Sequence, residues 1–118
     1  MKSSEVIKEY IYYSDIQKYC TQIGDYKQGN VAASNLEGIN DDLKTSMDKE
    51  SVQYIIDSVL DSDNPNAIMW ITPVCQCLQY RIPLIIEKLS AYSVDKELGI
   101  LSLNALMLLK TVKPVQKR

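Results

Sequence analysis

Apolar residues recur every three or four positions along almost the whole chain, as they do on one face of an amphipathic helix. The clearest stripe is formed by Val52, Ile55, Ile56, Val59 and Leu60. This spacing predicts an all-α fold of about six helices. Their expected ranges are about 3–23, 26–47, 49–60, 65–78, 82–91 and 93–112.

Polar and special residues mark the ends of these predicted helices. The expected N-caps are Ser3 or Ser4, Asp25, Asp48 and Asn64, because their side chains can accept a bond from a free amide of the first turn. Pro65 fits the first helical position, where no amide donor is needed. Gly29-Asn30, inside the second helix, indicates either a kink or close helix packing. Pro73 predicts a kink in the fourth helix, because its ring opposes the carbonyl four residues earlier.

The chain also resembles itself at an offset of 30 residues. This offset pairs Val52 with Ile82 and Ile55 with Ile85, and it continues into the next helix, pairing Ile71 with Leu101. It also pairs Trp70 with Ile100, so Trp70 is expected in the core. Such matches are typical of stacked helical hairpins. They predict a single domain over 1–118, made of a capping hairpin (1–47), two repeat hairpins (48–80 and 81–112) and a tail (113–118).

Short motifs add a family resemblance. Ser58-Val59-Leu60, the Asp63-Asn64-Pro65 turn and Ala67-Ile68-Met69-Trp70 resemble HEAT-type hairpins. The segment Gly24-Asp25-Tyr26-Lys27-x-x-Asn30 resembles the opening of a family of small bacterial HEAT-like proteins of unknown function. Some members of that family are similar to immunity proteins encoded beside polymorphic or contact-dependent growth inhibition toxins. The resemblance implies a HEAT-like α-α superhelix and supplies no catalytic motif.

Charge is distributed unevenly, although the net charge is only −2. Residues 37–63 hold eight acidic residues against Lys44 and Lys49, a local net charge of −6. An acidic rim attracts a basic partner and speeds its association. The candidate partner-binding residues are therefore Asp41, Asp42, Asp57, Asp61 and Asp63. The alternative is that these carboxylates only solvate the surface.

Two adjacent tyrosines form a second candidate surface. Tyr12 and Tyr13 cannot both face inward, because adjacent helical residues lie about 100° apart. At least one is expected to be exposed, and exposed tyrosines often anchor interfaces. Packing against the next helix is the alternative.

Catalysis is not expected. The chain contains no histidine, which removes the commonest general base and the partner of Ser and Cys nucleophiles. Asp57 and Asp61 are four apart and could share a helix face, as a Mg²⁺ site or a glycosidase pair would require, but solvated helix-end charge is the simpler interpretation. Cys20, Cys75 and Cys77 are expected to be reduced thiols, with Cys75 buried. We expect no metal, no cofactor and no catalytic residue.

These observations favour a cytoplasmic protein-binding domain without nucleic-acid or membrane partners. No secretory signal or membrane-length apolar run is apparent. A DNA glycosylase of HEAT-like fold would need a basic concave face, which the charge pattern does not favour. The leading hypothesis is an immunity or antitoxin-like protein that occludes a cognate toxin, expected to be basic and a nuclease. The alternative is a helical scaffold or adaptor. The sequence leaves the oligomeric state open.

Overall fold

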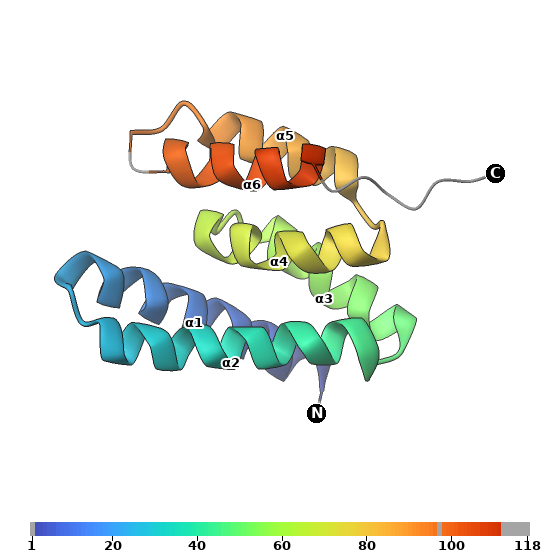
Figure 1. Cartoon of the computed structure of the whole chain (residues 1–118). Helices are drawn as coiled ribbons and strands as arrows, with labels where there is room; N and C mark the ends of the chain where they lie inside the picture. The colour runs from blue at the N-terminus through green and yellow to red at the C-terminus, as the bar shows by residue number, and fades with distance from the viewer. Residues whose placement is uncertain (1, 97, 112–118) are drawn as a thin grey trace.

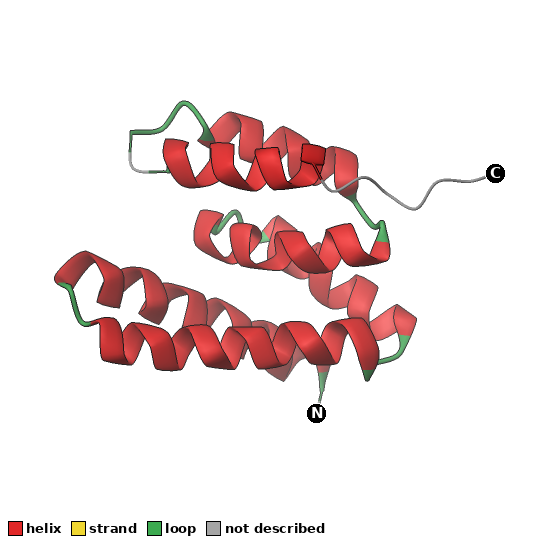
Figure 2. Ribbon diagram, in the orientation of Figure 1, coloured by secondary structure: helices red, strands yellow, loops and turns green. Residues whose placement is uncertain are grey.

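The protein is all-helical in the computed structural model, which describes residues 2–96 and 98–111. Within those residues it forms six helices. They are α1 (Ser3–Ile23), α2 (Tyr26–Thr45), α3 (Lys49–Asp61), α4 (Pro65–Leu78), α5 (Ile82–Tyr92) and α6 (Gly99–Thr111). The predicted fold class is confirmed, and short loops connect the helices (Figure 2).

Consecutive helices pair as three hairpins that lie on one another (Figure 1). The α1–α2 hairpin lies at one end of the stack and the α5–α6 hairpin at the other, with α4 between them. Helix α4 contacts α1 and α2 on one side and α5 and α6 on the other. The position of α4 therefore decides how the two outer hairpins sit relative to each other.

Three of the four predicted N-caps are present. The carboxylate of Asp25 accepts from the Gln28 amide (3.2 Å) and that of Asp48 from the Ser51 amide (3.0 Å). The side chain of Asn64 accepts from the Ala67 amide (3.2 Å), directly before Pro65. The prediction for the first helix was wrong: Lys2 occupies the N-cap position of α1 and makes no side-chain cap bond, so neither Ser3 nor Ser4 caps the helix.

The start of the last helix also differs from the prediction. Ser93 ends α5, where its amide bonds the carbonyls of Leu89 and Ser90. The carboxylate of Asp95 then accepts from the Leu98 amide (3.0 Å), and α6 begins at Gly99, not at Ser93 or Val94. The expected end near residue 112 and the tail 113–118 lie outside the described residues.

The core is formed by the predicted apolar stripes. In α3 all five residues of the stripe are buried. Helices α1 and α2 approach closely at Gly29, where an added Cβ would lie 3.4 Å from the Cβ of Cys20. The Gly29-Asn30 pair thus marks close helix packing. Helix α4 continues through Pro73 without a break.

The repeat holds only in part between α3 and α5 and slips by one residue between α4 and α6. Ile56 is fully buried, whereas Ile86, at the same offset of 30, is 41% exposed. Ile55 and Ile85, which the offset of 30 pairs, are both fully buried. In α6, however, Leu101 and Ile100 are 53% and 74% exposed, so their pairing with Ile71 and Trp70 was wrong. The buried position equivalent to Ile71 is Ser102, an offset of 31. The loop before α6 is longer than the one before α4, and this shifts the register.

A chain of two hydrogen bonds, the first buried and the second partly buried, connects α1, α2 and α4. Tyr10 (0% exposed) donates its hydroxyl to the side-chain oxygen of Asn40 (2.8 Å). The amide nitrogen of Asn40 donates to the backbone carbonyl of Trp70 (3.0 Å). This carbonyl lies in the turn of α4 that precedes Pro73, so the bond holds that turn of α4 against α2. Burial strongly raises the pKa of the Tyr10 hydroxyl, which therefore stays protonated as a donor.

We predict that Asn40→Ala destabilises the protein by about 1–3 kcal/mol or more, because it leaves the Tyr10 hydroxyl and the Trp70 carbonyl without this partner in the interior. Tyr10→Phe should cost about 1–3 kcal/mol through the orphaned Asn40 oxygen. Urea denaturation of each variant measures these two losses of unfolding free energy. Asn30→Ala, at an exposed position of the same helix, is the matched control and should change the stability by less than about 1 kcal/mol. Equal losses of unfolding free energy in Asn40→Ala and Asn30→Ala would contradict the stabilising role of the Asn40 hydrogen bonds.

Candidate functional site

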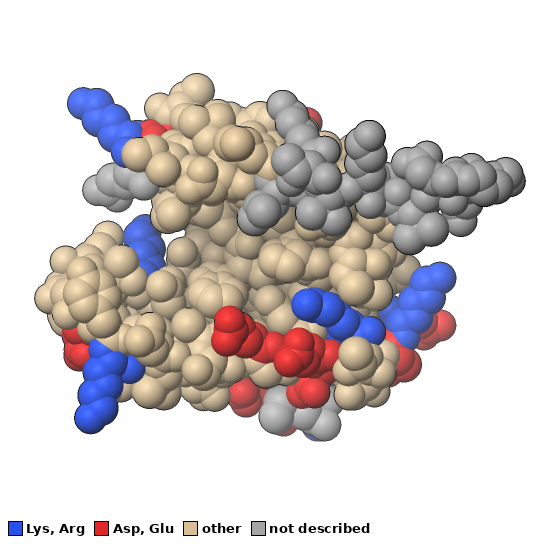
Figure 3. All heavy atoms as spheres, viewed as in Figure 1, with Lys and Arg blue, Asp and Glu red and all other residues tan. Residues whose placement is uncertain are grey.

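A groove opens between α1, α4 and α6, on the side of the stack where the two outer hairpins diverge. It encloses about 720 Å³ and is mainly apolar. Figure 3 shows a hollow between the α1–α2 and α5–α6 hairpins. A volume of this size lies within the range of ordinary ligand sites.

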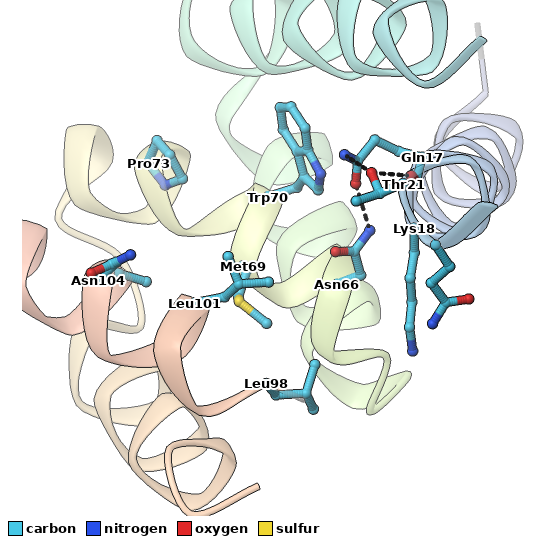
Figure 4. A pocket seen from close by; sticks show the side chains of 12 residues that line it. Gln17, Lys18, Thr21, Asn66, Met69, Trp70, Pro73, Leu98, Leu101 and Asn104 are labelled. Atoms are coloured by element: carbon cyan, nitrogen blue, oxygen red, sulfur yellow. Dashed lines mark hydrogen bonds between the residues drawn. The ribbon is translucent and has the colours of Figure 1, made fainter. Parts of the chain in front are cut away.

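One face of α4 forms the floor of the groove. Asn66, Met69, Trp70 and Pro73 follow the spacing i, i+3, i+4, i+7, so they form one stripe (Figure 4). The opposite stripe of α4, which includes Ile68 and Ile71, is fully buried in the core. Trp70 is only partly buried and lines the groove, so its expected place inside the core was wrong.

The two walls differ in chemistry. Helix α1 contributes Gln17, Lys18, Thr21 and Gln22. The α6 side contributes Leu98, Leu101, Asn104 and Ala105. The groove therefore has a polar wall, an apolar wall and an apolar floor.

Hydrogen bonds hold the α1 wall to the floor. The side-chain amide of Asn66 donates to the Ser14 carbonyl (2.6 Å) and to the Gln17 side-chain oxygen (3.3 Å). The amide nitrogen of Gln17 donates to the Thr21 hydroxyl (3.1 Å), as Figure 4 shows. These contacts hold the polar α1 wall in place before a ligand binds, which lowers the conformational-entropy cost of binding.

The lining residues that the structure describes carry little charge. Lys18 is the one charged residue among those that line it. The groove can bury apolar surface and donate or accept hydrogen bonds through its amides. A negative group at its edge would be attracted by Lys18.

The five predicted aspartates do not share one environment. Asp57 of α3 pairs with Arg81 through Oδ1 and Nε (2.9 Å) and accepts a bond from the Tyr80 hydroxyl (2.9 Å). The hydrogen bond from Arg81 holds the pKa of the Asp57 carboxyl below its usual value, and Tyr80 adds to the effect. Asp57 thus connects α3 to the turn between α4 and α5, with much of its charge already neutralised.

Asp63 is also paired, whereas the other three acids face solvent. Lys88 donates to the Asp63 carboxylate (2.9 Å), which holds α5 against the end of α3. Asp41, Asp42 and Asp61 are exposed. Figure 3 shows acidic side chains gathered along α2, the helix that carries Asp41 and Asp42. The acidic surface that remains open to a partner on this helix consists of Glu37, Asp41 and Asp42.

Tyr12 and Tyr13, which are adjacent on α1, differ in exposure. Tyr12 is 59% exposed, while Tyr13 is half-buried and packs against the core. Their rings meet edge to face with centroids 5.4 Å apart. The expectation that at least one of them is exposed is confirmed. Neither residue lines the groove.

The three cysteines differ in burial. Cys20 and Cys75 are buried and Cys77 is exposed, and all three are free thiols. Burial raises the pKa of the Cys75 thiol to about 12, so it stays protonated and unreactive. Across 2–96 and 98–111, no three His, Cys, Asp or Glu side chains converge where they could hold a metal ion. No helix in the described part of the chain is long and apolar enough to cross a bilayer.

Comparison with known proteins gives no match to a family model, to a curated protein or to a solved structure.

The groove was not predicted from the sequence, although its signal is present. Residues 66–73 carry apolar side chains on two faces of one helix, and residues 98–109 are apolar around nearly the whole circumference. A helix of this kind has more apolar surface than one hydrophobic core can cover. The apolar surface of α4 and α6 that the core does not cover lines the groove.

The Asp57 ion pair predicts a pH effect. The pKa of Asp57 is lowered in the folded state, so the stabilisation is complete above the unfolded-state value near 3.9 and is lost as the pH falls through the lower, folded-state value. Asp57→Asn should reduce the difference in unfolding free energy between pH 7 and pH 3 by at most about 1 kcal/mol, because the pair is solvent-exposed.

Urea denaturation at both pH values measures this difference. Asp41→Asn, at an exposed position of α2, is the control and should leave it unchanged. The Asp48 cap, whose pKa the Ser51 amide also lowers, accounts for part of the acid sensitivity that remains. An Asp57→Asn variant with the parent's full pH dependence would show that the pair contributes nothing.

Proposed function

We propose that this protein works by binding another protein, and that the α1–α4–α6 groove receives a short amphipathic helix of that partner. The apolar floor and α6 wall of the groove carry the proposal. Six apolar residues line this open space: Met69, Trp70, Pro73, Leu98, Leu101 and Ala105. Such a surface costs free energy while it faces water and regains it when an apolar ligand covers it.

The shape and charge of the groove favour a helix as the occupant. The floor stripe from Asn66 to Pro73 extends for about 10 Å, or two helical turns. A partner helix with anchors spaced i, i+3, i+4 would match that length. Its polar side would meet the amides of α1, and an acidic residue near its edge would meet Lys18.

Neutralisation of a toxin is the form of this function that the sequence favours. The resemblance to small HEAT-like proteins supports it, and so does the open acidic surface of Glu37, Asp41 and Asp42. A basic toxin would be steered to this surface and then occluded. The alternative is an adaptor that scaffolds other proteins. A toxin gene beside the gene for this chain favours immunity, whereas a conserved assembly partner favours the adaptor.

Trp70 makes the groove directly testable, because it is the chain's single tryptophan and lies in the floor. The probe is the adjacent gene's product, with its own tryptophans replaced by phenylalanine. Binding should shift the Trp70 emission to shorter wavelength as water leaves the groove. Leu101→Glu should weaken binding at least about tenfold, because it puts a charge on the apolar wall.

Val31→Glu is the matched control, since Val31 is as exposed as Leu101 (54% and 53%) but lies on α2, outside the groove. It should bind like the parent. If binding is unaffected by Leu101→Glu but is lost in high salt and in the double variant Asp41→Lys, Asp42→Lys, the interface lies on the acidic surface of α2 and not in the groove. Tight binding that does not protect cells from the partner would favour the adaptor.

A further inference from the structure

A second cavity lies where the turn between α2 and α3 meets the end of α4. It encloses about 340 Å³ between Leu43 of α2, Val52 of α3 and Leu78 of α4, and we call it the turn cavity. In Figure 1 the α2–α3 turn and the α4–α5 turn lie on the same side of the stack, and residues of both turns line this space. Among the described residues, none that lines the turn cavity also lines the α1–α4–α6 groove. The two spaces are therefore separate sites.

The apolar lining of the turn cavity belongs to the edge of the core. Leu43 and Val52 are members of the core cluster, and Met47 of the α2–α3 turn packs against that cluster. An apolar group that enters the cavity contacts these side chains and leaves water, which is favourable. A cavity of about 150 Å³ is enough for one benzene molecule. The turn cavity therefore has room for one aromatic ring or a short alkyl chain with a polar group attached.

Two lysines give the cavity its charge. Lys44 lies near the end of α2 and Lys49 begins α3, and both line the space. Neither lysine forms an ion pair with an acid in the part of the chain that the structure describes, whereas Arg81 and Lys88 are both paired. Gln53 also lines the cavity, and its side-chain amide can donate a hydrogen bond. Three donor groups, two of them cationic, thus surround an apolar space.

We propose that the turn cavity binds a small organic monoanion, namely a carboxylate attached to one aromatic ring or to a short alkyl chain. The lysines and Gln53 receive the carboxylate, because hydrogen bonds from ammonium groups to carboxylates are among the stronger ones in proteins. The apolar lining receives the ring or the chain. Ligand sites commonly combine a mainly apolar lining with a few polar groups that fix the orientation of the ligand.

The surrounding charge limits this ligand to a single negative charge. Residues 37–63 carry a net charge of −6, so a polyanion such as a nucleic acid would meet repulsion around the cavity. No acid lines the cavity itself among the residues that the structure describes. A lone carboxylate contacts the lysines directly, whereas acids farther away than about 8 Å are largely screened at physiological ionic strength.

Amide NMR on the labelled full chain, titrated with 4-phenylbutyrate as the probe, tests this site. Saturable shifts are expected at Lys44, Lys49 and Gln53, with a Kd below about 1 mM. The matched neutral probe is 4-phenylbutanamide, which has the same ring and chain but no charge. It should bind at least about tenfold more weakly, because it loses the ionic contacts with the lysines.

Two variants remove the predicted contacts. The double variant Lys44→Gln, Lys49→Gln should weaken binding of 4-phenylbutyrate at least about tenfold. Leu78→Glu, which places a carboxylate in the cavity lining, should do the same and is the second variant if the lysine variant does not keep the parent's circular dichroism. The matched controls are Lys27→Gln and Val31→Glu, at exposed positions of α2 outside the cavity. Both should bind the probe like the parent.

The groove supplies the last control, because it also combines apolar side chains with one lysine. Lys18→Gln should leave binding of 4-phenylbutyrate unchanged. Shifts centred on Met69 and Trp70, and lost in Lys18→Gln, would place the probe in the groove and overturn the proposal. Equal binding of the two probes, full binding by the double lysine variant, or no saturable shift up to about 10 mM would overturn it as well.

Discussion

The hydrogen-bond chain from Tyr10 through Asn40 to the Trp70 carbonyl is the constraint on which the rest of the structure depends. Its first bond is buried and its second is partly buried, so each of its members would cost free energy without a partner. It joins both helices of the first hairpin to α4. Apolar packing alone allows helices to shift by small amounts along each other. This directional link, together with the Asn66 bonds to Ser14 and Gln17, therefore fixes where α4 lies against the first hairpin. The spacing of the groove walls follows from that position.

The groove originates from surplus apolar surface on two helices. Helices α4 and α6 have more apolar surface than a core of three hairpins can bury, and their extra faces remain open. In α4 the surplus is Met69, Trp70 and Pro73 on the floor. In α6 it is Leu101 toward the groove and Ile100 and Leu103 on the far side. The open acidic surface of Glu37, Asp41 and Asp42 lies on α2, outside the groove, so the two candidate interaction surfaces are separate.

Local features were predictable from the sequence, and the register between distant elements was not. The caps at Asp25, Asp48 and Asn64 and the α3 stripe follow from contacts within a few residues, and the structure contains them. Trp70 was placed in the core because an apolar residue at a repeat position is normally buried. Trp70 instead lies on the groove side of α4, while the neighbouring stripe with Ile68 and Ile71 faces the core. The pairing of Asp57 with Arg81 also joins residues far apart in sequence, so charge counting alone could not reveal that this carboxylate is engaged.

The central claim is that the partner protein binds in the groove. Backbone and side-chain amide chemical shifts, measured by NMR on the labelled protein with and without the co-purified neighbouring gene product, test it most directly. The account predicts the largest changes at Gln17, Thr21, Asn66, Met69 and the Trp70 indole, with Glu37, Asp41 and Asp42 little affected at saturation. Changes confined to those three acidic residues and their neighbours on α2, with the groove signals unmoved, would contradict it.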